Sequence, residues 1–164
     1  NLSNVANDHV PHSVKLLRET LMHIASPAFA PNTMIPQRFT CQGEDINPAF
    51  QISDIPAGAH SLALIHDDPD APSKTWDHWL IWNIPAMAEI PENAAPGIQG
   101  QNSWGRNDYG GPCPPSGTHR YVYKLYALDR KLDLPAGATK AQLESAMRGH
   151  ILAQAELVGL YQQQ

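Results

Sequence analysis

Residues 61–84, SLALIHDDPDAPSKTWDHWLIWNI, contain two candidate β-strands separated by an acidic, proline-bearing loop. The first strand, Ser61–His66, follows a Pro-Ala-Gly turn and ends at that loop. The second, Trp79–Ile84, is apolar almost throughout, which predicts a strand buried on both faces. A third candidate, Tyr121–Leu128, is rich in β-branched and aromatic residues. Its alternation predicts one shared face for Tyr121, Tyr123, Leu125 and Ala127.

Prolines and glycines punctuate the chain on both sides of this stretch. The 15 prolines and 11 glycines favour turns and short strands over long helices. From residue 24 to residue 96 they divide the chain into segments of about 8–12 residues, the spacing expected of an all-β sandwich. The length of 164 residues and mass of 18.0 kDa fit one domain. Residues 1–20 are polar and are interpreted as an extension, with a short helix predicted over Ser13–Leu21.

One long helix is predicted near the C-terminus. Thr139–Gln142 has the pattern of a capping box, in which the side chains of the first and last residue cap the start of a helix. Apolar and other core-facing residues then follow at helical spacing: Leu143, Met147, Ile151, Gln154, Leu157, Val158 and Tyr161. We therefore expect one amphipathic helix packed on a sheet, with Gly149 and Gly159 weakening it or allowing close approach to a strand.

Charge and hydropathy exclude two classes of partner. Eleven basic and 16 acidic residues give a formal net charge of −5, and no basic cluster is present, so nucleic-acid binding is not expected. No apolar run approaches the length of a transmembrane segment. The two cysteines, Cys41 and Cys113, form no CxxC pair. Their spacing leaves open one long-range disulfide or two free thiols.

Three loops at the ends of candidate strands carry most of the reactive side chains. His66–Pro72 holds three carboxylates within four residues, Trp76–Trp79 places an imidazole beside two indoles, and Gly110–Tyr121 is a rigid glycine–proline loop. Each also has a structural interpretation, as an Asx turn, a packed core histidine or a plain loop. No Gly-x-Ser-x-Gly nucleophile motif or HExxH metal motif is present, so neither a catalytic residue nor a metal ligand is assigned.

Three of these motifs, Asp68–Ser73, His78 within Trp-Asp-His-Trp, and Gly111–Tyr121, together resemble the signature of the phosphatidylethanolamine-binding protein family. They are most similar to its prokaryotic branch, the Raf kinase inhibitor-like proteins of the YbhB/YbcL type. Ile24–Phe29 and Thr40–Pro48 are similar to the opening segments of that branch.

The resemblance spans nearly the whole domain, and it sets the expected boundaries. Residues 22–164 would form the family domain, and residues 1–21 would be an N-terminal extension without a counterpart in the family. The family fold is a mainly β, antiparallel sandwich with a C-terminal α-helix beside an anion-binding pocket for phosphate-like groups, including phospholipid headgroups. Carried onto this chain, the ligand-binding residues are Asp68, Asp70, Trp76, His78, Gly110, Gly111, Pro112, His119 and Tyr121.

The resemblance gives these residues readable roles. His78 and His119 would donate N–H groups and, when protonated, add positive charge opposite an anion. Asp68 and Asp70 would orient the histidines or accept hydrogen bonds from an ammonium headgroup. The Tyr121 hydroxyl would donate to the anion. Trp76 would form an apolar wall, and the glycines would let backbone N–H groups approach the ligand.

The function implied is that of a small soluble protein that binds phosphate or phosphoethanolamine and modulates partner proteins. The alternative is a kinase or peptidase inhibitor acting through surface loops, and a hydrolase or metal-dependent enzyme ranks below both. No cofactor is expected, a homodimer is typical of the branch, and the expected location is cytoplasmic, with a periplasmic, exported protein as the alternative. A disulfide between Cys41 and Cys113 is a further hypothesis, which the oxidation state of the thiols would test.

Overall fold

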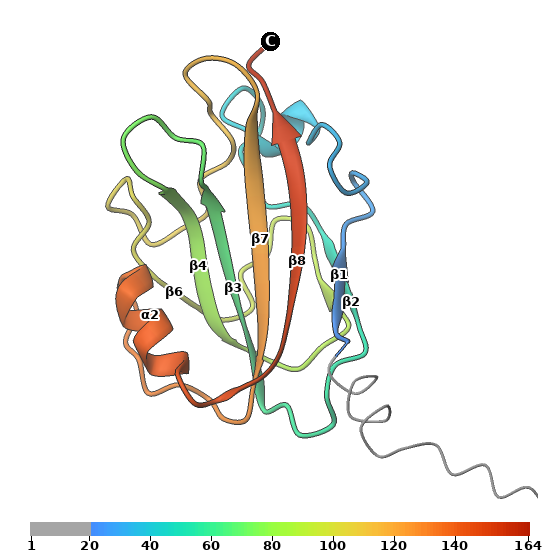
Figure 1. Ribbon diagram of the computed structural model, residues 1–164, viewed down its shortest axis with the longest axis vertical. Helices are drawn as coiled ribbons and strands as arrows, with labels where there is room; N and C mark the ends of the chain where they lie inside the picture. The colour runs from blue at the N-terminus through green and yellow to red at the C-terminus, as the bar shows by residue number, and fades with distance from the viewer. Residues whose placement is uncertain (1–20) are drawn as a thin grey trace, which may run out of the picture.

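The computed structural model describes residues 21–164 as two packed antiparallel sheets, which confirms the predicted mainly β sandwich (Figure 1). The smaller sheet has the strand order β1-β2-β5 and the larger the order β6-β4-β3-β7-β8. The strands are β1 (His23–Ala25), β2 (Phe50–Ser53), β3 (Ser61–Asp68), β4 (Trp76–Ile84), β5 (Glu89–Ile90), β6 (Ile98–Gln99), β7 (His119–Leu128) and β8 (Ile151–Tyr161). The helical elements are a short 3₁₀ turn, η1 (Gln37–Phe39), and an α-helix, α2 (Lys140–Met147).

The larger sheet is built on the three strands that the sequence predicted. β3 pairs with β4 on one side and with β7 on the other. All eight residues of β3 are buried, and β4 is buried on both faces except near its ends. The predicted face of β7 is also confirmed, because four alternate residues enter the core between the two sheets: Tyr121, Tyr123, Leu125 and Ala127.

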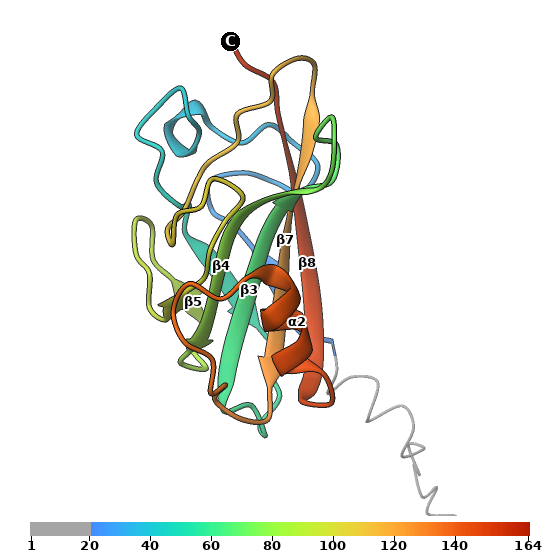
Figure 2. The same ribbon diagram turned by 90° about the vertical axis from the view of Figure 1, so that its left-hand side faces the viewer.

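A second apolar core explains why the central strands of the larger sheet are buried on both faces. Leu143 and Met147 of α2 pack on the face of the larger sheet that lies away from the smaller sheet. They cover side chains from β3 and β4 that include Ile65, Leu80 and Trp82. Figure 2 shows α2 lying across this outer face, with β5 on the other side of the sheet.

The predicted long C-terminal helix is wrong beyond Met147. The capping box is present at Thr139 and Gln142, but the helix ends at Met147, and Gly149 adopts a left-handed φ of 82°. Residues 151–161 then form β8, which pairs with β7 along most of its length. The spacing of Leu157 and Tyr161 suits a helix, but both residues also lie on one face of a strand with period two. Pairing with the long edge of β7 decides between the two periods.

Residues 1–20, with the predicted helix over Ser13–Leu21 and nearly all of the predicted extension, lie outside the residues that the structure describes. Within residues 21–164, no helix is both long enough and apolar enough to cross a membrane.

One end of the sandwich carries the loops that the sequence had singled out. β3 ends there, and β4 and β7 begin there, so the 69–75 loop and the 100–118 segment meet at the same edge (Figure 1). The turn after η1 lies at this end as well, where the Cys41 N–H donates to the Pro112 carbonyl at 3.1 Å. The fold thus brings three distant segments around a common space.

Candidate functional site

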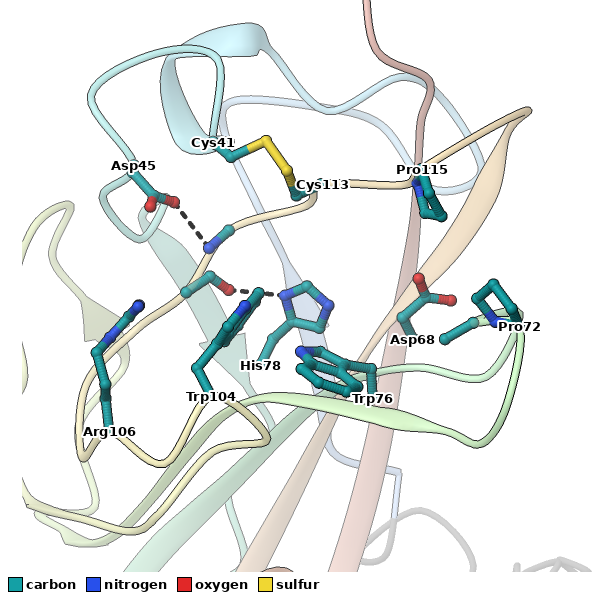
Figure 3. Close-up of a pocket in the computed structure, with 13 residues that line it drawn as sticks. Cys41, Asp45, Asp68, Pro72, Trp76, His78, Trp104, Arg106, Cys113 and Pro115 are labelled. Atoms are coloured by element: carbon teal, nitrogen blue, oxygen red, sulfur yellow. Dashed lines mark hydrogen bonds between the residues drawn. A yellow bond between two sulfur atoms is a disulfide. The ribbon is translucent and has the colours of Figure 1, made fainter.

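A cavity of about 420 Å³ opens between these loops (Figure 3). Its walls are mainly apolar, formed by two tryptophans, two prolines and a cystine, with a few polar groups among them. The lining residues are Cys41, Asp45, Asp68, Ala71, Pro72, Trp76, His78, Trp104, Arg106, Gly110, Gly111, Cys113 and Pro115. Five of the nine predicted binding residues are among them: Asp68, Trp76, His78, Gly110 and Gly111. α2 contributes no lining residue.

His78 projects from β4 into the centre of this site and is almost fully buried. Its Nδ1–H donates to the carbonyl oxygen of Gly110 at 2.8 Å. The ring packs edge-on against Trp104 and Tyr121, with centroids 4.9 and 5.3 Å away. Burial lowers the pKa of His78 below its usual value, although the Gly110 carbonyl and the Asp68 carboxylate act in the opposite direction. The imidazole is therefore neutral near pH 7 in the free protein.

Asp68, at the end of β3, lies at the other polar point of the cavity. One carboxylate oxygen accepts the Nδ1–H of His119 at 2.7 Å, and the other accepts the backbone N–H of Asp70 at 2.8 Å. The side chains of Asp68 and His119 are only 5% and 10% exposed, so solvent screens this pair little. His119 does not itself line the cavity. It holds the Asp68 carboxylate in place from the neighbouring strand.

Asp70 lies outside the cavity lining and is bound to Arg120 instead. Its two carboxylate oxygens accept the Arg120 Nε–H and Nη2–H at 3.0 and 2.8 Å, and the Arg120 backbone N–H at 2.9 Å. The guanidinium hydrogen bonds lower the pKa of Asp70 to about 2, although burial acts in the opposite direction. Asp70 thus ties the loop after β3 to the start of β7.

Tyr121 is fully buried behind the cavity rather than in its lining. Burial, followed by the nearby Asp68 carboxylate, raises the pKa of Tyr121 far above its usual range, so the phenol keeps its proton. Its hydroxyl makes no hydrogen bond to any of the residues that the structure describes. Pro112 also lies outside the lining, and its carbonyl accepts the N–H of Cys41.

Gly110 and Gly111 permit close packing, and their N–H groups already have partners. A Cβ on Gly111 would lie 2.3 Å from the Phe39 carbonyl oxygen, and one on Gly110 would lie 2.2 Å from the Trp104 ring. The Gly111 N–H donates to Asp45 Oδ1 at 2.8 Å, and the Gly110 N–H donates to the His78 carbonyl at 3.1 Å. The two glycines therefore shape the wall instead of presenting free donors to a ligand.

A disulfide forms another part of the wall. The Sγ atoms of Cys41 and Cys113 are bonded at 2.12 Å, with the Cα atoms 5.5 Å apart. The bridge joins the turn after η1 to the glycine–proline loop (Figure 3). Two segments separated by 72 residues are thereby fixed on the same side of the cavity.

Sequence reasoning missed Trp104 and Arg106, which form the far wall of the cavity. Trp104 is 39% exposed, and the Arg106 guanidinium lies 5.3 Å from its ring centroid. Arg106 also donates through Nε–H to Asp108 at 3.0 Å. The only sequence signal for them was the order Trp-Gly-Arg in a loop. No local sequence pattern places that loop beside His78. Asp45 was missed in the same way, whereas Ala71, Pro72 and Pro115 belong to loops that the sequence had singled out, although none of the three was named as a binding residue.

Figure 3 shows the polar groups spread along the cavity, with Arg106 at one end and Asp68 at the other. Trp104, His78 and Trp76 lie between them. Among residues 21–164, no group of three or more His, Cys, Asp or Glu side chains is arranged to hold a metal ion. The chemistry within this site is that of hydrogen bonding, aromatic contact and a single guanidinium.

Comparison with known proteins gives one consistent result. A family model described as phosphatidylethanolamine-binding protein matches residues 25–162. A UPF0098 protein of Methanothermobacter thermautotrophicus is 49% identical over 148 residues, which cover 85% of this chain and 98% of that relative. A UPF0098 protein of Chlamydia muridarum is 45% identical over 149 residues, with 87% and 99% covered.

Two solved structures are similar over almost their whole length. A crystal structure described as that of a phosphatidylethanolamine-binding protein homologue from Chlamydia trachomatis has a TM-score of 0.85 and 41% identity. It covers 88% of this chain and 99% of that one. The structure of Escherichia coli YbcL, described as a member of the mammalian family, has a TM-score of 0.81 and 27% identity, with 87% and 99% covered.

Proposed function

The chain belongs to the phosphatidylethanolamine-binding protein family, and on this premise we propose that it is a binding protein for a small phosphorylated headgroup. The observation that carries the proposal is the cavity of about 420 Å³ into which Asp68, His78 and Arg106 project between tryptophan walls. A concave, mostly apolar site with a few convergent polar groups is typical of small-molecule recognition. Its size suits a headgroup such as phosphoethanolamine.

The charges in the cavity favour a ligand that combines an anionic group with hydrogen-bond donors. Arg106 supplies a guanidinium, which suits a phosphate because its N–H groups match the phosphate oxygens. Asp68 and neutral His78 supply acceptors at the other polar end. Trp76 and Trp104 cover the carbon atoms between these groups. A phosphorylated headgroup satisfies both ends in one molecule.

The kinase- or peptidase-inhibitor alternative depends on an exposed surface that a protein partner would cover. The large apolar side chains that are exposed in the described part of the chain are Leu21, Met34, Trp104, Ile151 and Leu152. Of these, only Trp104 borders the cavity. The observation that distinguishes this molecule is therefore a ligand-sized cavity, and the proposal is confined to small-molecule binding.

Calorimetric titration of the full chain with phosphoethanolamine tests the proposal. We expect saturable binding that weakens about 3- to 10-fold in the Arg106→Ala variant, because a charge-assisted contact to the phosphate is lost. Arg130→Ala is the matched control, since Arg130 is similarly exposed and also lies beside an aspartate, at Asp129. Failure of phosphoethanolamine to bind, or equal weakening in both variants, would contradict the proposal.

A further inference from the structure

The cystine formed by Cys41 and Cys113 belongs to the cavity wall and is nevertheless exposed. Both residues line the cavity, and both are exposed in the folded chain. We propose that a small-molecule thiol entering the cavity is captured there as a mixed disulfide on Cys41, with Cys113 leaving as the thiolate. This reactivity goes beyond the proposed function, and it does not depend on which headgroup the cavity binds.

Exposure decides whether a disulfide can react in the native fold. Exchange requires a thiolate to reach one of the two sulfur atoms, so a bridge buried in a core reacts only after the fold opens. Figure 3 shows the bridge at the edge of the cavity, above Trp104 and His78. The cavity of about 420 Å³ has room for a thiol of a few heavy atoms. A small thiol therefore reaches the sulfur atoms without any unfolding.

One hydrogen bond distinguishes the two sulfur atoms. Gln163, close to the C-terminus, donates from Nε2 to Cys113 Sγ at 3.7 Å and to the Pro114 carbonyl at 2.8 Å. In an exchange, the sulfur that is not attacked leaves as a thiolate, and a donor beside it stabilises that charge. The hydrogen bond that Cys41 makes to this loop uses its backbone N–H and not its sulfur. Cys113 is therefore the better leaving group, and the incoming thiol bonds to Cys41.

The step balances with the small thiol as its only co-reactant. The thiolate of the small molecule forms a new S–S bond to Cys41 Sγ, and the bond between Cys41 and Cys113 breaks. The electron pair of that bond goes to Cys113 Sγ, which takes up a proton in place of the one that the small thiol lost. The small thiol is thereby oxidised to a mixed disulfide, and Cys113 is reduced to a free thiol. The chain has no third cysteine that could rearrange the bridge.

Hydrogen bonds that do not involve sulfur keep the two segments together after the exchange. The Cys41 N–H donates to the Pro112 carbonyl at 3.1 Å. The Gly111 N–H donates to Asp45 Oδ1 at 2.8 Å. The free thiol of Cys113 therefore stays beside the mixed disulfide and expels the small thiol again when its concentration falls. Capture is reversible, and the captured group occupies the cavity while it lasts.

The test is mass spectrometry of the native full chain after brief exposure to 2-mercaptoethanol, with free thiols alkylated at once by iodoacetamide. Each modified chain should carry one mixed disulfide and one alkylated cysteine. Peptide mapping should find the mixed disulfide on Cys41 about 3- to 10-fold more often than on Cys113, as one hydrogen bond to the leaving group predicts. In urea the two positions should react equally. Absence of exchange in the native chain, or equal adducts on both cysteines, would overturn the inference.

A pair of tail variants tests the assignment of the leaving group. Gln163→Ala removes the donor to Cys113 Sγ, so the excess of adduct on Cys41 should fall to about equality. Gln162→Ala is the matched control, because Gln162 is also exposed and its side chain accepts a hydrogen bond from Thr118. The control should keep the native excess. Loss of the excess in both variants, or in neither, would contradict the role of Gln163.

Competition with phosphoethanolamine shows whether the captured thiol occupies the cavity. With this ligand at ten times its dissociation constant, exchange should slow about tenfold, because only the free chain reacts. An unchanged rate at that saturation would place the exchange on the outer side of the bridge and overturn the proposed capture. Failure of phosphoethanolamine to bind would contradict the proposed function alone. The preference for Cys41 and its dependence on Gln163 would still decide whether the exchange occurs as proposed.

Discussion

Asp67 and Asp68 are consecutive residues of β3, and both are buried, but they lie on opposite faces of the sheet and are balanced in different ways. Asp67 lies under α2, where the Nζ groups of Lys124 and Lys140 donate to its Oδ2 at 3.2 and 3.3 Å. Asp68 faces the cavity and has one imidazole N–H and one backbone N–H.

The two carboxylates differ in whether their oxygens can still accept hydrogen bonds from a ligand. Two ammonium groups offset the charge of Asp67, and burial excludes water from its carboxylate. Burial alone would lower the pKa of Lys140, but the carboxylates of Asp77 and Asp67 raise it. Lys140 therefore stays charged, and the ion pairs on this face of the sheet are kept. Asp68 is held firmly but remains open to the cavity. The first arrangement serves stability, whereas the second leaves acceptor capacity for a ligand.

The largest effect on folding should come from Asp67→Ala. Removal of this carboxylate leaves two lysine ammonium groups partly buried without their partner, and we expect a loss of about 2–4 kcal/mol in the free energy of unfolding. Urea unfolding followed by fluorescence would measure it. Asp129→Ala, which breaks a surface ion pair, is the control and should cost less than about 1 kcal/mol. A smaller loss for Asp67 than for Asp129 would remove the distinction between the two sides of the sheet.

Asp68→Ala should show the opposite balance. Water from the cavity can occupy the space of the lost carboxylate, so we expect a stability loss of only about 1–2 kcal/mol. The affinity for phosphoethanolamine should fall about 10- to 100-fold, because an acceptor for the ligand disappears together with the partner of His119. Calorimetry on the same protein preparation would give both values. Native affinity in this variant would show that Asp68 is structural, like its neighbour.

How far the sequence predicted the fold depended on the length of each pattern. β3, β4 and β7 are long, and their apolar runs or alternation identified them. The strands of the smaller sheet have only two to four residues, too few for any periodic signal. In β8 the periods of helix and strand coincided at several positions, and only the pairing with β7 distinguishes them.

The site was predictable where its residues belong to one motif, and not where it depends on contacts between distant loops. Asp68, Trp76 and His78 follow from the two loops that flank the ends of β3 and β4. Trp104 reaches the site because Gly110 has no Cβ to displace it, which is a tertiary fact. Asp70 belongs to the same motif as Asp68, yet the guanidinium of Arg120 donates hydrogen bonds to both of its carboxylate oxygens.

The ion pair between Asp70 and Arg120 should give the smallest effect on stability. It adds a third aspartate, largely exposed with its partner, to the comparison of Asp67 with Asp68. Its hydrogen bonds hold the pKa of Asp70 at about 2, below the unfolded value of about 4, so the pair stabilises the fold above pH 4. This contribution is lost as the pH falls through about 2. Because the Arg120 and Asp70 side chains are 60% and 32% exposed, Asp70→Asn should lower the melting temperature by only about 1–3 °C.

The pH dependence of that small difference separates an ion pair from mere packing. Melting curves of the native chain and of Asp70→Asn should differ near pH 6 and converge near pH 2, where the native carboxyl takes up a proton. Arg120→Ala should reproduce the effect, and the double variant should add little to either single change, because one interaction is removed in all three. A difference that persists unchanged at pH 2 would show that Asp70 acts through its shape. Asp70 would then hold the loop beside the cavity by packing alone, with no contribution from its ion pair with Arg120.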